Sequence, residues 1–380
     1  MMDVSELLRL TSCTKQVQQL ARRMKQIKLF SALPCSQKEP INVLDIFGLF
    51  QIQLMNGFPE FLQTNPLLFN LVISNNIGIE INLKVEKNLK WYLFVHFSGE
   101  KPRFKEQGED NHFIVDNQLI PCISSRMKKE LYIFWEDKTA GMLTLVTWIR
   151  RTFNIQFETM LISAGDQPGY SNEFRSIVNH VKELQSLYTN VIIDERKRFL
   201  EDNDLEFIMR NVTGCKKYYH LGIRTTPISY RQKVETDKLL ICPAHWFTFQ
   251  HLLLTNCVFI NVVDSTVSDD DLTTFVANTL NGSFPRLKHV TLKQPNISVA
   301  NILLCGGNRR GYIRDGIYIS TNNKTLPIRI GAVVEHDSET RAVTVTFPQR
   351  KRLMTFEMFV WPDIGGNYFN NRNEIRPFGF

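Results

Sequence analysis

Cysteines and histidines are the first residues of this sequence whose types could do chemistry. The seven cysteines are scattered, and no two form a C-x-x-C pair. Zinc ligands arrive in closely spaced pairs, and the nearest candidates, Cys242, His245 and His251, have no matching second pair. An odd number of scattered cysteines is typical of free thiols. The pattern therefore predicts reduced cysteines and no metal site.

An acidic run and a glycine cluster are the other candidates for ligand binding. Asp269 to Asp271 could bind magnesium, but Ser268 before the run and Asp271 three positions later form the pattern of a helix capping box. The cluster from Gly306 to Gly311 lacks the Lys-Ser/Thr pair of a phosphate-binding loop. We expect a helix start at the first site and a loop at the second.

Catalytic signatures are missing as well. The sequence contains no G-x-S-x-G, no H-E-x-x-H and no G-x-G-x-x-G motif. We therefore predict a protein that is not an enzyme and that carries no cofactor. A hydrolase whose site assembles from distant residues is the alternative that motifs cannot address.

Length and composition limit the class of protein that must position such residues. A chain of 380 residues with 43% hydrophobic and 22% charged residues predicts a globular protein of two or three domains. The net charge of +7 would suit weak binding to nucleic acid or anionic lipid, but over this length it is typical of an ordinary solvated surface. We find no leader pattern and no apolar run of the ~20 residues that cross a bilayer, so we expect an intracellular protein of the cytoplasm or nucleus.

Hydrophobic spacing divides the chain into four regions. Residues 1–40 have helical spacing, and residues 41–160 contain strand-like runs at Ile79–Leu83, Trp91–Val95 and Leu131–Trp135. The charged stretch Ser98–His112 contains Gly and Pro and predicts a loop. Residues 161–362 form the third region, and we expect residues 363–380 to be a loosely ordered tail.

The third region alternates helical and strand patterns. Phe174–Leu184, Trp246–Leu254 and Asp269–Asn281 have helical spacing, with Gly282 as a stop signal after the last of them. Strands are expected near Ile192, Leu221, Leu240, Ile260 and Val290. These intervals favour leucine-rich-repeat-like stacking over an ordinary α/β layer, which remains the alternative.

A β-hairpin is expected to end the third region. Arg341–Phe347 and Met354–Trp361 are the two strand-like runs, separated by a polar, basic turn. The fold class is therefore α/β, or α+β overall: a short N-terminal helical segment, a β-rich middle and a repeat-like C-terminal domain that ends in a hairpin.

Several segments resemble one known family. Trp246–Leu253, Cys257–Val262, Ser268–Phe275 and Asn281–Lys288 resemble the F-box associated type 2 domain of the nematode F-box family. In that family tryptophan is usual where Thr279 stands here, and asparagine where Phe284 stands. Met2–Lys15 resembles the second half of a nematode F-box, so we expect an N-terminally truncated F-box, and Phe356–Pro362 is similar to the family's C-terminal strand.

The resemblance implies a substrate-recognition subunit of a Skp-cullin-F-box ubiquitin ligase. The partners would be a Skp-family adaptor, the cullin ligase core and a target protein bound by the C-terminal domain. The candidate adaptor-binding residues are Leu7, Leu8, Leu10 and Leu20. They could instead close the N-terminal domain. The alternative function is a stand-alone protein-interaction module that has lost adaptor binding, and a nucleic-acid-binding protein is less favoured because it rests on the net charge alone.

Overall fold

A computed structural model places most of the chain after residue 66. It describes residues 67–74, 77–83, 90–107, 109–116, 118–125, 130–153, 157–165, 170–184, 190–211, 214–222, 224, 228, 233–294, 309–319, 325–335, 342–346, 349–350, 353–363, 366 and 376–377. The chain divides into two compact units. Unit 1 comprises Met1–Asn70 and Asn76–Ile155, and unit 2 comprises Leu71–Asn75 and Gln156–Phe380. The predicted helical segment 1–40 and its four leucines lie outside the described residues.

Unit 1 is a mixed sheet with a helix on each face. Its elements are β2 (Ile77–Leu83), β3 (Lys90–Phe97), η3 (Ser98–Gln107), β4 (Glu109–Val115), β5 (Gln118–Ser125), β6 (Glu130–Trp135) and α5 (Lys138–Phe153). The strand order is β2-β3-β6-β5-β4, and only the pair β3–β6 is parallel. The strands predicted at 79–83, 91–95 and 131–135 are confirmed.

One prediction for unit 1 was wrong. The stretch 98–112, expected to be a loop, forms the 3₁₀ helix η3 and the start of β4. This charged stretch contains one aromatic residue, Phe104, whose ring centroid lies 4.7 Å from that of Tyr132. The β-rich middle also contains a 16-residue helix, α5, which places Trp148 5.4 Å from Phe113. Aromatic side chains of η3 and α5 thus pack against side chains of the sheet.

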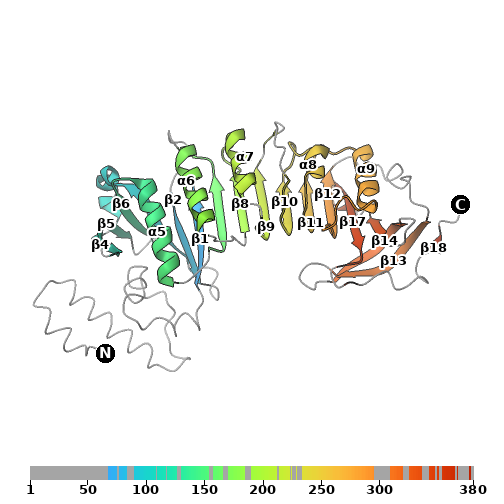
Figure 1. Cartoon of the computed structure of the whole chain (residues 1–380), viewed down its shortest axis with the longest axis horizontal. Helices are drawn as coiled ribbons and strands as arrows, with labels where there is room; N and C mark the ends of the chain where they lie inside the picture. Colours follow the sequence, from blue (N-terminus) through green and yellow to red (C-terminus); the bar gives the residue numbers. More distant parts are fainter. Residues whose placement is uncertain are drawn as a thin grey trace, which may run out of the picture. The chain divides into compact units, whose positions relative to one another are not determined.

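Unit 2 is built on six parallel strands that neighbour one another in chain order. They are β7 (Thr159–Ser163), β8 (Asn190–Glu195), β9 (Lys217–Gly222), β10 (Lys238–Cys242), β11 (Phe259–Val263) and β12 (His289–Gln294). The helices between them are α6 (Tyr170–Glu183), α7 (Asp202–Asn211), α8 (Phe249–Leu253) and α9 (Asp269–Leu280). Figure 1 shows these helices along one side of the row of strands. β1 (Leu67–Ile73) pairs with β7.

An antiparallel section follows β12. Its strands are β13 (Arg309–Ile319), β14 (Thr325–Glu335), β15 (Ala342–Thr346), β16 (Gln349–Arg350), β17 (Leu353–Trp361) and β18 (Arg376–Pro377). β17 pairs with β12 on one side and with β15 on the other, so the predicted hairpin is confirmed. Within the predicted tail, β18 pairs with β13.

Alternating hydrophobic residues explain why the parallel strands form. Every second side chain of β7 to β11 is buried, and the buried positions share the same register rows. α6 covers them with a stripe at helical spacing that includes Phe174, Ile177 and Val181. This alternation assigns one face of the sheet to the helices.

Helix α9 begins and ends as the sequence predicts. Asp271 N donates to Ser268 Oγ at 3.2 Å, and Ser268 N donates to Asp271 Oδ2 at 2.9 Å, which completes the capping box. Gly282 ends the helix at a φ of 85°, a conformation in which glycine avoids steric cost.

The α/β fold class is confirmed, and so are most of the expected elements of unit 2. The strands expected near Ile192, Leu221, Leu240, Ile260 and Val290 are present as β8 to β12. α8 is shorter than expected, and β7 had no prediction of its own. Kinship with leucine-rich repeats stays a prediction. Among the described residues, no helix combines the length and hydropathy that a membrane crossing requires.

Candidate functional site

The parallel sheet of unit 2 has one face that its helices leave uncovered. The first, third and fifth residues of each strand from β7 to β11 are partly exposed, whereas the second and fourth are buried. Because the strands are in register, the partly exposed side chains form rows that cross the sheet. We call this surface the open face.

The middle row of the open face is apolar across four strands. Leu161, Ile192, Tyr219 and Leu240 are consecutive register partners, and all four are partly exposed. Because these side chains are already partly buried, covering them would be favourable by less than the roughly 1.5–3 kcal/mol that applies to a fully exposed leucine or isoleucine. We call these four residues the apolar strip.

The first row of the open face is polar and basic. Asn190 Nδ2 donates to Thr159 Oγ1 at 3.2 Å, and the next two positions are Lys217 and Lys238, which are direct register partners. Lys238 Nζ lies 5.1 Å from the centroid of the Phe259 ring, within the range of a cation–π contact. We call Lys217 and Lys238 the lysine pair.

Aromatic stacking continues this row into β12 and β17. The His289 ring lies 4.8 Å from Phe259 and 4.6 Å from Phe359, with the latter pair stacked. His289 Nε2 lies 3.4 Å from Glu357 Oε1. Such cross-strand pairs hold this end of the row in one arrangement.

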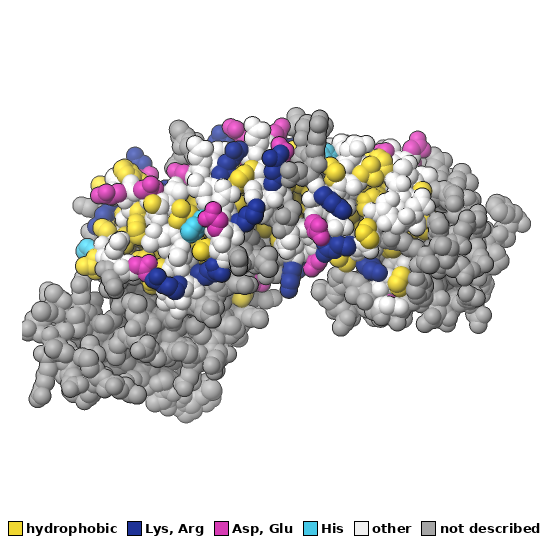
Figure 2. Space-filling model, viewed as in Figure 1, with side chains coloured by type: hydrophobic (Ala, Val, Ile, Leu, Met, Phe, Trp, Pro, Cys, Tyr) yellow, Lys and Arg dark blue, Asp and Glu magenta, His cyan; other side chains and the backbone are white. Residues whose placement is uncertain are grey.

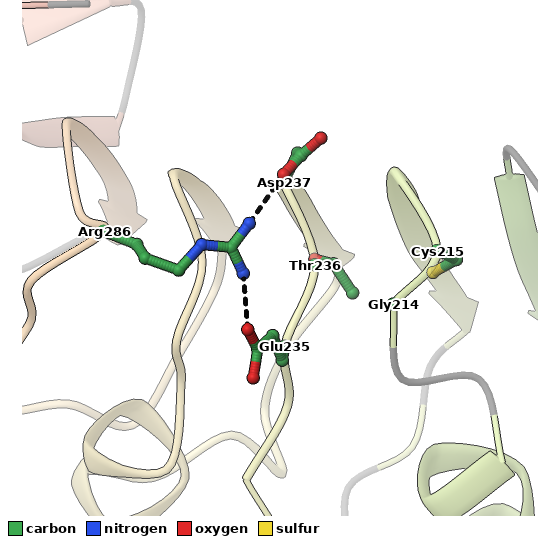
Figure 3. A pocket seen from close by; sticks show the side chains of 6 residues that line it. All are labelled: Gly214, Cys215, Glu235, Thr236, Asp237 and Arg286. Atoms are coloured by element: carbon green, nitrogen blue, oxygen red, sulfur yellow. Dashed lines mark hydrogen bonds and ion pairs between the residues drawn. The ribbon is translucent and has the colours of Figure 1, made fainter.

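A pocket of about 370 Å³ lies at the amino-terminal edge of β9 and β10. It is lined by Gly214, Cys215, Glu235, Thr236, Asp237 and Arg286. Figure 3 shows Arg286 reaching toward both carboxylates. Its guanidinium donates to Glu235 Oε1 at 3.1 Å and to Asp237 Oδ1 at 2.7 Å, and also to Asn256 O at 3.1 Å. Because the Arg286 guanidinium is already paired with two carboxylates, this pocket is poorly suited to an anionic ligand.

The thiols at this edge are poor nucleophiles. Burial raises the pKa of Cys215 to about 12, and the neighbouring Cys257 thiol and the Asp237 charge add to the shift. Burial also raises the pKa of Cys257, and this effect outweighs the hydrogen bond with Thr236, which lowers the pKa. Because the thiolate is the reactive form, covalent catalysis by these cysteines is disfavoured.

A buried ionic cluster lies at the opposite, carboxyl-terminal ends of β8 and β9. Glu195 is 1% exposed and accepts hydrogen bonds from Arg224 Nη2 at 2.9 Å and Leu200 N at 2.8 Å, with His220 Nε2 at 2.7 Å. Arg224 also bonds Asp202. Gly222 leaves room for this packing, since a Cβ there would lie 2.5 Å from Glu195 Cβ. These hydrogen bonds satisfy the buried Glu195 carboxylate from within the protein, which supports a structural role for the cluster.

The residues singled out from the sequence are not brought together as a metal site. The described residues contain no group of three or more His, Cys, Asp or Glu that could hold a metal ion. His251 uses both ring nitrogens locally: Nδ1 accepts from Thr248 N at 3.0 Å, and Nε2 lies 2.7 Å from Ile228 O. Asp271 serves the capping box.

The open face and the lysine pair were missed by sequence reasoning. A usable signal existed, because lysine begins both Lys217–Gly222 and Lys238–Cys242. Aligning the two strands on that lysine would have predicted the pair. Arg286 and its carboxylates offer no comparable signal, since about 50 residues separate them.

Comparison with known proteins places one family on this region. Residues 225–292 match the family model described as F-box associated. The match covers β10, β11, α8, α9 and the first four residues of β12, and includes Lys238, Leu240 and Arg286. No curated protein matches the chain. Residues 225–292 are therefore similar to the F-box associated family, which is a family of protein-interaction domains.

Proposed function

We propose that this protein is the substrate-recognition subunit of a Skp-cullin-F-box ubiquitin ligase. In this role residues 1–40 dock a Skp-family adaptor, and the domain of residues 161–362 holds the target protein. The protein itself performs no chemistry. It brings the target to the ligase core.

One observation carries the proposal: the match of residues 225–292 to the F-box associated family. The open face supports it, because a sheet face without helices offers an extended surface to a partner. The buried thiols and the Arg286 pocket offer no competing catalytic site among the described residues.

Co-purification with a Skp-family adaptor tests the proposal. The tagged full chain is co-expressed with the adaptor and analysed by affinity capture and size-exclusion chromatography. We expect a stoichiometric complex that is lost when Leu7 and Leu10 are both changed to Asp. Leu119→Asp is the matched control, since Leu119 is 67% exposed in unit 1 and should leave the complex intact.

Absence of a complex at micromolar protein would overturn the ligase role. A folded chain that fails this test would be a stand-alone interaction module. Equal adaptor capture by the Leu7/Leu10 variant would overturn the assignment of the docking residues.

A further inference from the structure

The loop between β8 and α7 (Figure 1) holds an exposed aromatic side chain in a fixed place. Residues 196–199 are all exposed, and the buried residues Glu195 and Leu200 flank them. We call residues 196–200 the Phe199 loop. We infer that this loop is a preorganised recognition element, and that Phe199 inserts into an apolar pocket of a folded partner protein. The inference deepens the proposed function and rests on it only in calling that partner a ubiquitination target.

Both backbone polar groups of Leu200 are bound by buried side chains. Its N–H donates to Glu195 Oε1 at 2.8 Å, and its carbonyl oxygen accepts a hydrogen bond from Arg224. At the other end of the loop, Arg196 N donates to Asp194 Oδ1 at 3.1 Å. The first and last residues of the Phe199 loop are therefore tied to β8 and to Arg224, which restricts the conformations of the residues between them.

The Phe199 ring contacts the same arginine that binds Leu200. Arg224 Cζ lies 5.6 Å from the centroid of the ring, within the range of a cation–π contact. Arg224 is itself held by hydrogen bonds to Glu195 Oε1, at 2.9 Å, and to Asp202. Because Arg224 is only 3% exposed whereas Phe199 is 50% exposed, the contact fixes the ring from the buried side and leaves half of it open to a partner.

A positioning role explains why a buried ionic cluster lies beside this loop. A buried ion pair contributes little net stability compared with apolar residues of the same size, because its charges lose their hydration. Here the cluster binds the Phe199 loop at Leu200 and at the Phe199 ring. A side chain that is already fixed loses less conformational entropy when it binds, which strengthens binding. Glu195 and Arg224 therefore act as positioning residues for Phe199.

The charges around Phe199 favour a protein partner over nucleic acid or a lipid surface. Residues 194–202 contain three basic and three acidic side chains besides the buried Glu195. In Figure 2, acidic and basic side chains of the described residues are interspersed on the visible face. Polyanions bind to several cations that are not balanced by nearby carboxylates. Protein interfaces, by contrast, combine a central aromatic anchor with a polar rim. An apolar pocket with polar edges is the partner surface that fits this loop.

Selection of binding proteins on the full chain tests the inference. The probe is a phage-displayed library of designed ankyrin-repeat proteins, whose randomised surface is concave and can form a pocket. Independent clones are purified, and their affinities for the full chain are measured by surface plasmon resonance. The test variant is Phe199→Ala. Phe97→Ala is the matched control, because Phe97 in unit 1 is also 50% exposed.

We expect most clones to bind through the Phe199 loop. Their affinity should fall at least about tenfold in Phe199→Ala and less than about twofold in Phe97→Ala. Glu195→Gln should weaken the same clones at least about threefold, whereas clones bound elsewhere should keep their affinity. Amide hydrogen exchange of residues 196–200 should become faster in that variant. If Glu195→Gln does not fold, Arg224→Lys replaces it, and changes in the same direction are expected.

Two results would overturn the recognition loop: clones that bind Phe199→Ala and Phe97→Ala equally well, and displacement of the clones from the loop by an oligouridine. Unchanged affinity for the folded Glu195→Gln chain would overturn the positioning role. Adaptor capture reports the proposed function separately. Binding through Phe199 without an adaptor complex would refute the ligase role alone, and an adaptor complex without binding through Phe199 would refute only this inference.

Discussion

Glu195 illustrates how single residues hold the sheet of unit 2 together. Burial acts to raise the pKa of its carboxyl, but hydrogen bonds and charges from His220 and Arg224 outweigh that effect and hold the pKa below its ordinary value. The charged form is therefore the one present at neutral pH. Removing one partner of a buried ion pair leaves the other charge without compensation.

Glu195→Ala should destabilise the protein strongly. We expect a loss of about 3 kcal/mol in the free energy of unfolding, the lower end of the range for a broken buried ion pair, because Arg224 would stay buried with Asp202 as its remaining ionic partner. Urea denaturation followed by circular dichroism measures the change. Glu206→Ala is the control, since it removes a more exposed i,i+4 pair with Arg210 and should cost less than about 1 kcal/mol. Similar losses in the two variants would contradict the role given to Glu195.

Two histidines couple stability to pH. Burial lowers the pKa of His251 and outweighs the hydrogen bond to Ile228 O, which would raise it. Burial also lowers the pKa of His96 and outweighs the hydrogen bond and charge of Glu100, which would raise it. The unfolded chain therefore binds more protons than the folded chain at pH values below the ordinary histidine pKa of about 6.5. Stability is present above that pH and is lost as the pH falls.

His251→Gln should flatten this pH dependence. Glutamine can accept the Thr248 N–H but does not titrate, so the free energy of unfolding should fall less between pH 7 and pH 5 than in the wild type. Denaturation at several pH values measures the slope. Thr274→Ala, a neutral substitution at an exposed position, is the control and should leave the slope unchanged. An unchanged slope in His251→Gln would show that His251 does not contribute.

At the scale of elements, the capping box of α9 is the clearest local determinant. Ser268→Ala should lower the free energy of unfolding by about 1 kcal/mol, because the Asp271 N–H loses its acceptor. Thermal or urea unfolding measures this change in the free energy of unfolding. Thr274→Ala, exposed on the same helix, should change stability by less than about 0.5 kcal/mol. Equal effects at the two positions would argue against the cap.

The segments that precede the parallel strands form a ladder of small side chains. Cys215, Thr236 and Cys257 each lie two residues before register partners, and Thr236 Oγ1 lies 3.5 Å from Cys257 Sγ. Thiol and hydroxyl side chains are small, so they can lie side by side in the segments that precede β9, β10 and β11. The ladder is buried, so its thiols are shielded.

Alkylation of Cys215 and Cys257 should be slow in the folded protein. With a pKa near 12 for Cys215, modification at pH 8 should be at least about a hundredfold slower than for an exposed thiol. Peptide mapping by mass spectrometry after iodoacetamide treatment measures this. An Asn203→Cys variant supplies the exposed comparison. Rapid native modification of Cys215 would contradict its burial.

At the scale of the whole molecule, our proposal assigns adaptor docking and target docking to different parts of the chain. Leu7→Asp with Leu10→Asp should abolish adaptor capture and keep binding of the selected ankyrin-repeat clones. Phe199→Ala should do the reverse, because the two sets of residues are far apart in the sequence. Parallel capture and surface plasmon resonance measurements on the same preparations test this. Loss of both activities in either variant would contradict the separation.

Many elements of unit 2 follow from the sequence alone, because hydrophobic alternation and capping are local. Strands β8 to β12, helix α9 with its Ser268 cap, and the β15–β17 hairpin follow from spacing within a few residues. The stretch that became η3 could not be predicted this way, since Phe104 is ordered by Tyr132 from another strand.

Only the tertiary structure decided which side chains share a surface. The lysine pair, the apolar strip and the bonds of Arg286 to Glu235 and Asp237 depend on the register between strands. Register is set by the buried rows of the whole sheet together with the helices that cover them, and no local window of sequence contains that information. The sequence thus specified what each strand would bury, and the packing of all the strands determined what the open face presents.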